Sequence, residues 1–381
     1  MDRIKDKTLL LLSSVGAVAF LFMALAELKP NRISHGIRYS GFEFLGVLGI
    51  AVLLLWVILI AIALYDKRHK EIVIFIITTI LVISLFWSLQ LCTGDYIGDS
   101  SSRISLSSGF YIQIFCVYML FSTYTKRIKE YKFIKFIGII GIFGILTYFM
   151  MTGAFDDLSL IKEYYIKETQ FYDNLRIHGM LTLGSVLAGS IIAIPLGFTA
   201  YFKNKLENKI MVPLSIIETI PSLSLFGVLL VPLSGLGKLP FFDAIGVSGI
   251  GWAPAFVALT LYTLLPIGRN TLTGFYSVDK NVIEAAIGMG MSRRQVLIRI
   301  ELPLAFPVIF AGIKIAFIQT IGGAVLAGLV GGGGMGTFVF LGLGEASPDL
   351  ILLGVLPIVF FTVILNYILN AFEEFMRGCC I

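Results

Sequence analysis

The sequence predicts an all-α membrane protein with about ten transmembrane helices, and three observations support this fold class. Charged residues make up 14% of the 381, against about 25% in a soluble domain. Aliphatic, aromatic and sulfur-containing side chains make up 57%, which is more apolar surface than a soluble fold of this size could bury. These residues also gather in runs that approach or exceed the roughly 20 residues a helix needs to cross the hydrocarbon core.

Ten such runs follow one another along the chain. They cover residues 9–28, 42–65, 71–92, 107–125, 135–151, 178–202, 211–233, 253–271, 304–329 and 350–371. The segment 152–177 is the longest outer connection and divides the runs into two sets of five. We therefore expect a five-span N-terminal extension at 1–151, an outer connecting segment at 152–177, a second five-span unit at 178–372 and a cytoplasmic tail at 373–381.

The lysines and arginines predict the orientation, because cytoplasmic connections retain an excess of them. With the N-terminus inside, twenty of the 29 fall in inner segments. Ten spans then place both termini in the cytoplasm. The net charge of +5 is explained in the same way, so it does not point to nucleic acid as a partner.

A charged, glycine-containing segment interrupts the apolar sequence between the eighth and ninth runs. Its first part, 278–287, suits a short helix that Ser277 could cap. The "GMG" at 288–290 would end that helix, since glycine accepts the backbone angles of a sharp turn.

A second short helix is predicted directly after this turn. Ser292 and Gln295 have the spacing of a capping box, and Val296 and Ile300 share one face of the helix. Pro303 is expected to end it. On the residues alone, the segment is explained as an interfacial linker whose arginines touch lipid phosphates. A DNA-binding helix-turn-helix is a remote alternative, because two spans hold the segment against the bilayer.

The spacing within this segment resembles the EAA loop of bacterial ABC importer permeases. That pattern is E-A-A, three residues, G, nine residues, I, one residue, L-P. The matching residues are Glu284, Ala285, Ala286, Gly290, Ile300, Leu302 and Pro303. The resemblance implies that residues 278–303 couple the spans to a separate ATP-binding subunit.

Three more stretches, 218–237, 258–279 and 322–336, resemble the glycine betaine, carnitine and choline branch of that family. The resemblance covers about 178–372, which would be the permease core. It implies a transport subunit of the bacterial plasma membrane that is not itself an enzyme. The implied partners are an ATP-binding subunit that holds the ATP, an extracytoplasmic solute-binding protein and a second permease subunit, either identical or related. An outer insertion at 238–253 and the five N-terminal spans depart from the short form of the family.

Little else in the sequence could carry chemistry. No phosphate-binding motif G-x-x-x-x-G-K-[ST] occurs, so we expect no ATP hydrolysis and no cofactor in this chain. The run "GGGGMG" at 331–336 lacks the required lysine and is interpreted as a flexible outer turn. The histidines and cysteines show no spacing typical of a metal site.

Three polar residues lie inside predicted spans, where they are costly and often functional. Glu218 is in the seventh run, and Lys314 and Gln319 are in the ninth. Each either lines a water-filled translocation path or makes a structural hydrogen bond between helices.

The sequence therefore favours an ABC importer permease for a glycine betaine-like osmoprotectant. A permease for methionine or another amino acid is the alternative. A passive channel or a membrane-embedded enzyme is a remote one, because an enzyme would show clustered His, Asp or Glu side chains.

Overall fold

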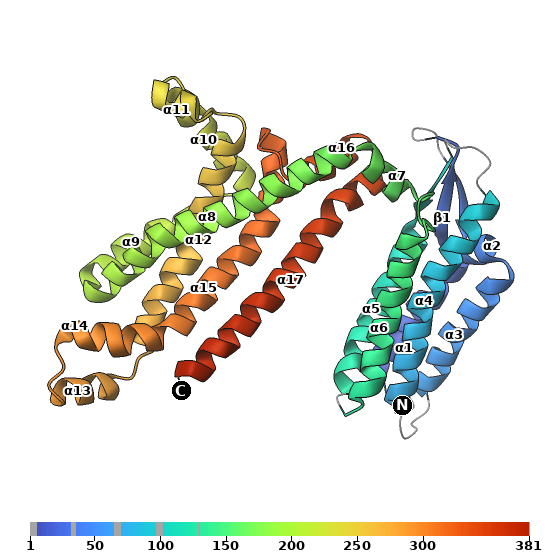
Figure 1. Cartoon of the computed structure of the whole chain (residues 1–381), viewed down its shortest axis with the longest axis horizontal. Helices are drawn as coiled ribbons and strands as arrows, with labels where there is room; N and C mark the ends of the chain where they lie inside the picture. The colour runs from blue at the N-terminus through green and yellow to red at the C-terminus, as the bar shows by residue number, and fades with distance from the viewer. Residues whose placement is uncertain (1–5, 32–35, 65–69, 97–101, 129, 381) are drawn as a thin grey trace. The chain divides into compact units, whose positions relative to one another are not determined.

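A computed structural model describes residues 6–31, 36–64, 70–96, 102–128 and 130–380. The chain is mostly helical and divides into two compact units, Met1–Ile166 and Lys167–Ile381 (Figure 1). Each unit is described by itself below.

The first unit contains helices and a small sheet. Its helices are α1 (Lys7–Phe22), α2 (Gly41–Leu45), α3 (Val47–Leu64), α4 (Lys70–Tyr96), α5 (Ser108–Arg127), α6 (Lys132–Met151) and α7 (Ser159–Ile166). Its strands are β1 (Ala24–Lys29), β2 (Ile37–Ser40) and β3 (Arg103–Leu106), which pair antiparallel in the order β2-β1-β3.

The sheet corrects the all-α prediction. The first apolar run, predicted as a span over 9–28, is helical only as far as Phe22, and β1 follows. Leu25 and Ala26 of β1 are buried, whereas Glu27 accepts a hydrogen bond from the Gly36 amide at 3.0 Å. A buried strand is as apolar as a helix, so hydropathy alone does not separate the two. Within this unit the sheet lies at the ends of the helices away from the N-terminus (Figure 1).

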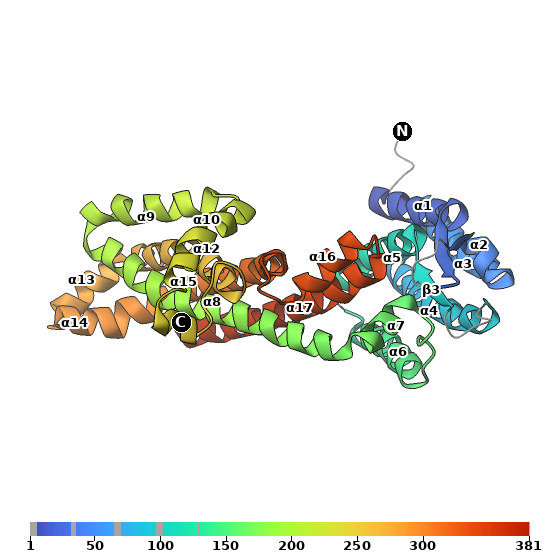
Figure 2. The same cartoon turned by 90° about the horizontal axis from the view of Figure 1, so that it is seen from above.

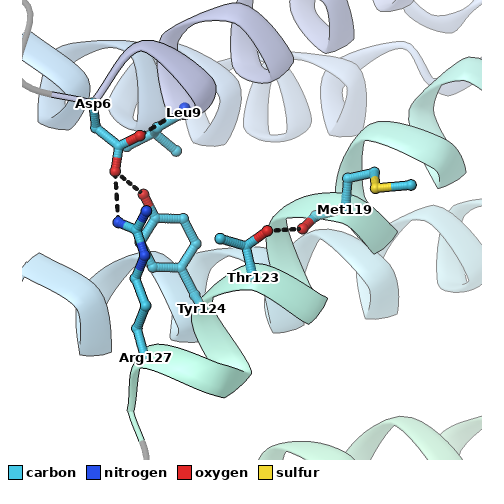
Figure 3. A network of polar contacts seen from close by, with 6 residues as sticks. All are labelled: Asp6, Leu9, Met119, Thr123, Tyr124 and Arg127. Atoms are coloured by element: carbon cyan, nitrogen blue, oxygen red, sulfur yellow. Dashed lines mark hydrogen bonds and ion pairs between the residues drawn. The ribbon is translucent and has the colours of Figure 1, made fainter.

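A polar network ties the start of α1 to the end of α5 (Figure 3). Asp6 caps α1 by accepting from the Leu9 amide at 3.1 Å. It also accepts from the Tyr124 hydroxyl at 2.6 Å and from Arg127 at 2.8 Å. Burial by itself would raise the pKa of the Asp6 carboxyl, but these hydrogen bonds outweigh it and hold the pKa below its usual range.

The second unit is helical throughout its described residues. It contains α8 (Glu168–Phe202), α9 (Asn204–Thr219), α10 (Ser222–Leu236), α11 (Pro240–Ala244), α12 (Trp252–Tyr276), α13 (Lys280–Gly288) and α14 (Arg293–Val296). A π-helical turn (Leu297–Glu301), α15 (Leu302–Gly323), a 3-10 helix (Ala324–Val330), α16 (Gly336–Gly344) and α17 (Pro348–Cys380) complete it.

Helix α12 lies at the centre of this unit, packed against α8 and α15. Small residues allow the close approach. A Cβ on Gly189 of α8 would clash with Thr263, and one on Gly312 of α15 would clash with Asn270. Helices α9 and α10 also contact α12, and the view from above shows α9 running alongside it (Figure 2).

Six helical segments within the described residues are long and apolar enough to cross a membrane, or seven if the bent pair α9–α10 is one span. The six are Val47–Leu64, Lys70–Trp87, Lys132–Met151, Glu168–Phe202, Arg293–Val330 and Pro348–Met376. The predicted count of about ten spans and the inside location of both termini stay predictions.

Two predicted boundaries differ from the observed helices. Helix α8 begins at Glu168, so the end of the predicted outer segment 152–177 already belongs to a long helix. Helix α17 continues to Cys380, which makes the predicted tail helical up to that residue. Ile381 lies outside the described residues.

Candidate functional site

The predicted coupling segment forms two short helices, but a different residue caps the first. Asp279, not Ser277, accepts from the Asn281 amide at 2.9 Å and begins α13. Ser277 instead donates to the Gly274 carbonyl at 2.7 Å at the end of α12. The difference arises because α12 extends five residues beyond the end of the predicted run, to Tyr276.

Gly290 makes the turn between the two helices with a φ of +87°. Residues with a side chain rarely adopt this left-handed backbone conformation, so glycine suits the position. Its amide donates to the Ile287 carbonyl at 2.9 Å. A Cβ built at Gly290 would meet nothing within 4 Å, so within this chain there is room for a side chain.

The second helix begins with the predicted capping box. The Gln295 amide donates to Ser292 Oγ at 3.4 Å, and the Ser292 amide donates to Gln295 Oε1 at 2.8 Å. The prediction that Pro303 ends this helix is wrong, because Pro303 lies in the first turn of α15, which continues without a break. The π-helical turn Leu297–Glu301 precedes α15, and the Leu302 amide donates to the Leu297 carbonyl across this wider turn.

An ion pair between an exposed arginine and a buried glutamate links the start of the second helix to the π-helical turn. Arg293 donates to Glu301 at 2.9 Å, and the Glu301 side chain is fully buried. The Arg293 guanidinium also lies 5.8 Å from the centre of the Phe202 ring, at the end of α8. The sequence analysis missed Glu301 because the two charges are eight residues apart, a spacing that would not align in a regular helix. The extra residue of the π-helical turn brings them onto one face.

The motif residues divide between a packed side and an exposed side. Ala286 and Val296 are buried, and Ile283 and Leu297 pack against a buried cluster that includes Phe275. Ile300 is half-buried. The residues that are exposed on the isolated chain are Glu284, Ala285, Gly290, Leu302 and Pro303. The segment is thus anchored to the helix core while most of its motif residues remain available to another molecule.

Helices α9 and α10 meet at a sharp break. Their axes differ by 105°, and Ile220 and Pro221 have extended backbone angles between them. The Tyr262 hydroxyl of α12 donates to the Ile220 carbonyl at 2.6 Å. This bond satisfies a carbonyl that the helix end would otherwise leave without a partner.

A cavity of about 270 Å³ lies at this break, and it contains two of the three residues predicted for a translocation path. Glu218 comes from α9, and Gln319 comes from α15. The other lining residues are Ile220, Ser222, Leu259, Tyr262, Thr320 and Gly323. Irregular backbone between membrane helices is tolerated where it lines a cavity, and the α9–α10 break does so.

Lys314 lies elsewhere and is not among the residues that line this cavity. Its ammonium group contacts the Glu373 carboxylate and donates to Asn370 Oδ1 at 3.0 Å, both on α17. The lysine and the glutamate side chains are 20% and 11% exposed. The contacts fit the structural alternative for Lys314, an interhelical ion pair.

The glycine run was interpreted as a flexible outer turn, but its residues are closely packed. Gly332, Gly334 and Gly336 are buried, and Gly334 lies against the ring of His178. The loop borders a second cavity, of about 590 Å³, together with Trp252 and Phe256. Within the described residues, no group of three or more His, Cys, Asp or Glu side chains could hold a metal ion.

Comparisons with known proteins agree with these features. Residues 185–377 match the family described as the binding-protein-dependent transport system inner membrane component. The chain belongs to this family. Residues 3–161 match the N-terminal domain of the ABC transporter permease YehY, which accounts for the extension that the short-form resemblance left unexplained.

Characterised relatives of the permease core are osmoprotectant permeases. The choline transport system permease protein OpuBB of Bacillus subtilis is 38% identical over 52% of this chain and 84% of its own length. The glycine betaine/carnitine/choline permease protein OpuCB of the same organism is 37% identical with the same coverage. The osmoprotectant import permease protein OsmW of Salmonella typhimurium is 35% identical over 48% of this chain and 80% of its own.

Solved structures that resemble the chain include the inward-facing MetNI methionine ABC transporter, at 22% identity and a TM-score of 0.47 over 55% of this chain and 97% of that one. The family match and the relatives of the permease core confirm the predicted family. The protein is a multi-pass permease subunit of an ABC importer in the bacterial plasma membrane, and its family works with an ATP-binding subunit and a solute-binding protein.

Proposed function

We propose that this permease imports a quaternary ammonium osmoprotectant of the glycine betaine type. The observation that carries the proposal is the 37–38% identity to permeases named for choline, glycine betaine and carnitine over most of their length. This identity to permeases named for quaternary ammonium compounds favours the osmoprotectant over the amino-acid alternative.

We further propose that residues 278–303 pass the movement of the ATP-binding subunit to the spans. The exposed motif residues offer a contact surface, and apolar side chains beside them, such as Ile287 and Met289, are also exposed. The buried side of the segment is held by the Arg293–Glu301 pair and the Phe275 cluster. A push on the exposed surface would therefore move this part of the helix core with it.

Helix geometry connects that surface to the cavity. The helical segment Arg293–Val330 runs from the coupling segment past Gln319, which lines the cavity. At 1.5 Å per residue, the distance from Arg293 to Gln319 along the axis is roughly 39 Å. A single long helix can transmit a tilt over this distance, because its backbone hydrogen bonds are made within itself.

The transport path is proposed to pass the α9–α10 break, with Glu218 and Gln319 on its wall. One permease core forms half of a pathway in this family type, so we propose a second permease subunit, identical or related. ATP would be bound and hydrolysed by the separate ATP-binding subunit, with no cofactor in this chain.

Uptake in cells tests the substrate class. A strain without other betaine uptake systems should regain growth at high osmolarity on glycine betaine when it expresses this permease with its ATP-binding subunit and solute-binding protein. Restored uptake of methionine, without uptake of glycine betaine, choline or carnitine, would contradict the proposal and support the amino-acid alternative.

A further inference from the structure

The cavity at the α9–α10 break has an unusual charge balance for a site between membrane helices. Among the described residues that line it, Glu218 is the one carboxylic acid, and none is a lysine, arginine or histidine. The Glu218 carboxylate is exposed to the cavity region and makes no ion pair or hydrogen bond with any described residue. An uncompensated carboxylate at membrane depth is costly, so a cation that can pair with it would be stabilised there.

Two other acids of the second unit are already paired with bases within the chain. Lys314 is paired with Glu373 of α17, and Glu301 is paired with Arg293. Neither pair leaves a positive charge for Glu218. Among these three acids of the second unit, Glu218 alone lacks a basic partner within the described residues.

Two hydroxyls of the cavity have their protons engaged, so they present oxygen lone pairs and no donor to a ligand, which suits a cation. The Tyr262 and Thr320 hydroxyls donate to the Ile220 and Ala316 carbonyls, at 2.6 and 2.7 Å. The Tyr262 side chain remains as an aromatic surface, which attracts quaternary ammonium groups. Leu259 adds an apolar wall. A methylated ammonium group needs such charge and apolar contact, and it needs no acceptor with a fixed direction.

The cavity is also of a suitable size. Its volume of about 270 Å³ lies just below the roughly 300 Å³ at which pockets for drug-sized ligands begin. A small solute with a trimethylammonium group would fit, whereas a peptide would not.

We propose that the Glu218 cavity is a cation-selective stopping point in the translocation path, which takes the quaternary ammonium group of the substrate after its release from the solute-binding protein. The inference rests on the proposed function and adds a binding site within the permease itself. Selection would thus occur twice, once in the solute-binding protein and once at the α9–α10 break.

Thiol labelling tests binding without requiring transport. In the assembled complex, Cys92, Cys116, Cys379 and Cys380 are replaced by serine, and Ser222→Cys provides a single reporter in the cavity wall. Tetramethylammonium should slow the reaction of this cysteine with a polar thiol reagent, whereas sodium at the same concentration should not. When Glu218→Gln is added, the tetramethylammonium concentration that gives the same protection should rise roughly tenfold. This is the change expected when about 1.4 kcal/mol of binding free energy is lost.

Uptake in vesicles that contain the complete importer gives the second measurement. Glu218→Gln should lower choline uptake roughly tenfold, Glu218→Asp should retain more of it, and ATP hydrolysis stimulated by loaded binding protein should persist. Glu207→Gln is the matched control, because Glu207 lies on the same helix outside the cavity. It should transport normally.

The outcomes separate the two proposals. Normal choline uptake by Glu218→Gln, or equal protection of the reporter cysteine in both backgrounds, would overturn the cation site alone. A wild-type importer that moves no quaternary ammonium compound would overturn the proposed function and this inference together. Loss of the complex in Glu218→Gln, measured by size-exclusion chromatography, would show that Glu218 is an assembly contact and would also overturn the site.

Discussion

Replacement of Gly290 separates a coupling surface from a simple surface turn. The residue has a φ of +87°, and a Cβ there would contact nothing within 4 Å in this chain. Substitutions therefore act in two ways that can be told apart. They strain the backbone, and they add a side chain that can collide only with a bound partner.

The strain is limited in size. A residue other than glycine costs about 1–2 kcal/mol in the left-handed region, which shifts a local equilibrium by roughly 5- to 30-fold. Asparagine tolerates this region better than alanine or leucine. If strain alone matters, Gly290→Ala and Gly290→Leu should be about equally impaired, and Gly290→Asn should be the mildest. If a partner must approach closely, the loss should follow side-chain size, with leucine and asparagine worse than alanine.

The assay is ATP hydrolysis stimulated by loaded binding protein, together with retention of the ATP-binding subunit during purification. We expect Gly290→Leu to reach the membrane at a normal level and to lose stimulation. Gly344→Leu is the matched control, since Gly344 is another exposed glycine with open space around its Cβ and lies far from the segment in sequence. Two results would refute the coupling surface. One is wild-type stimulation of ATP hydrolysis in well-expressed Gly290→Leu, and the other is equal impairment of the alanine and leucine variants with asparagine the mildest.

Three further predictions concern contacts within the chain. Lys314→Ala should lower the unfolding free energy by roughly 3–5 kcal/mol, because it leaves the partly buried Glu373 carboxylate without its cation. Thermal unfolding in detergent measures this loss of stability. The exchanged pair, Lys314→Glu with Glu373→Lys, should restore much of the lost stability. Asp6→Ala should cost about 0.5–2 kcal/mol at neutral pH as a lost helix cap. Because the Asp6 pKa is lowered in the folded state, its contribution is present above the ordinary aspartate pKa and is lost as the pH falls below about 4, so the variant should lose less stability on acidification than the wild type. Tyr262→Phe should reduce uptake by loosening the α9–α10 break, since the Ile220 carbonyl loses its donor, at a cost of about 1–3 kcal/mol; unchanged unfolding and uptake would show that this bond is dispensable.

Hydropathy and motif spacing predicted the helical character, the permease family and the two-helix coupling segment, because each depends on local sequence. The capping box at Ser292 was readable for the same reason. Strand β1 could not be predicted from the sequence, since Ala24–Lys29 continues an apolar run and pairs with residues as distant as Leu106. Only the tertiary partner decides between strand and helix there.

The details of the candidate site also depended on contacts between distant segments. The run 211–233 was predicted as one continuous span, and only the structure shows that α10 turns by 105° from α9 and that Tyr262 satisfies the Ile220 carbonyl. The sequence could not decide between the two alternatives for Lys314, because its partner, Glu373, is 59 residues away on α17. The Arg293–Glu301 pair was concealed by a π-helical turn, which changes the helical spacing on which sequence patterns rely.

The most direct test of the account is ATP-driven uptake by purified components. The permease is reconstituted in liposomes with its ATP-binding subunit and its solute-binding protein, and the accumulation of labelled glycine betaine, choline and methionine is compared. The account predicts accumulation of glycine betaine or choline that requires ATP, the binding protein and an intact Gly290 turn, with no hydrolysis by the permease alone. Accumulation of methionine only, or quaternary ammonium uptake that needs neither ATP nor the other subunits, would contradict it.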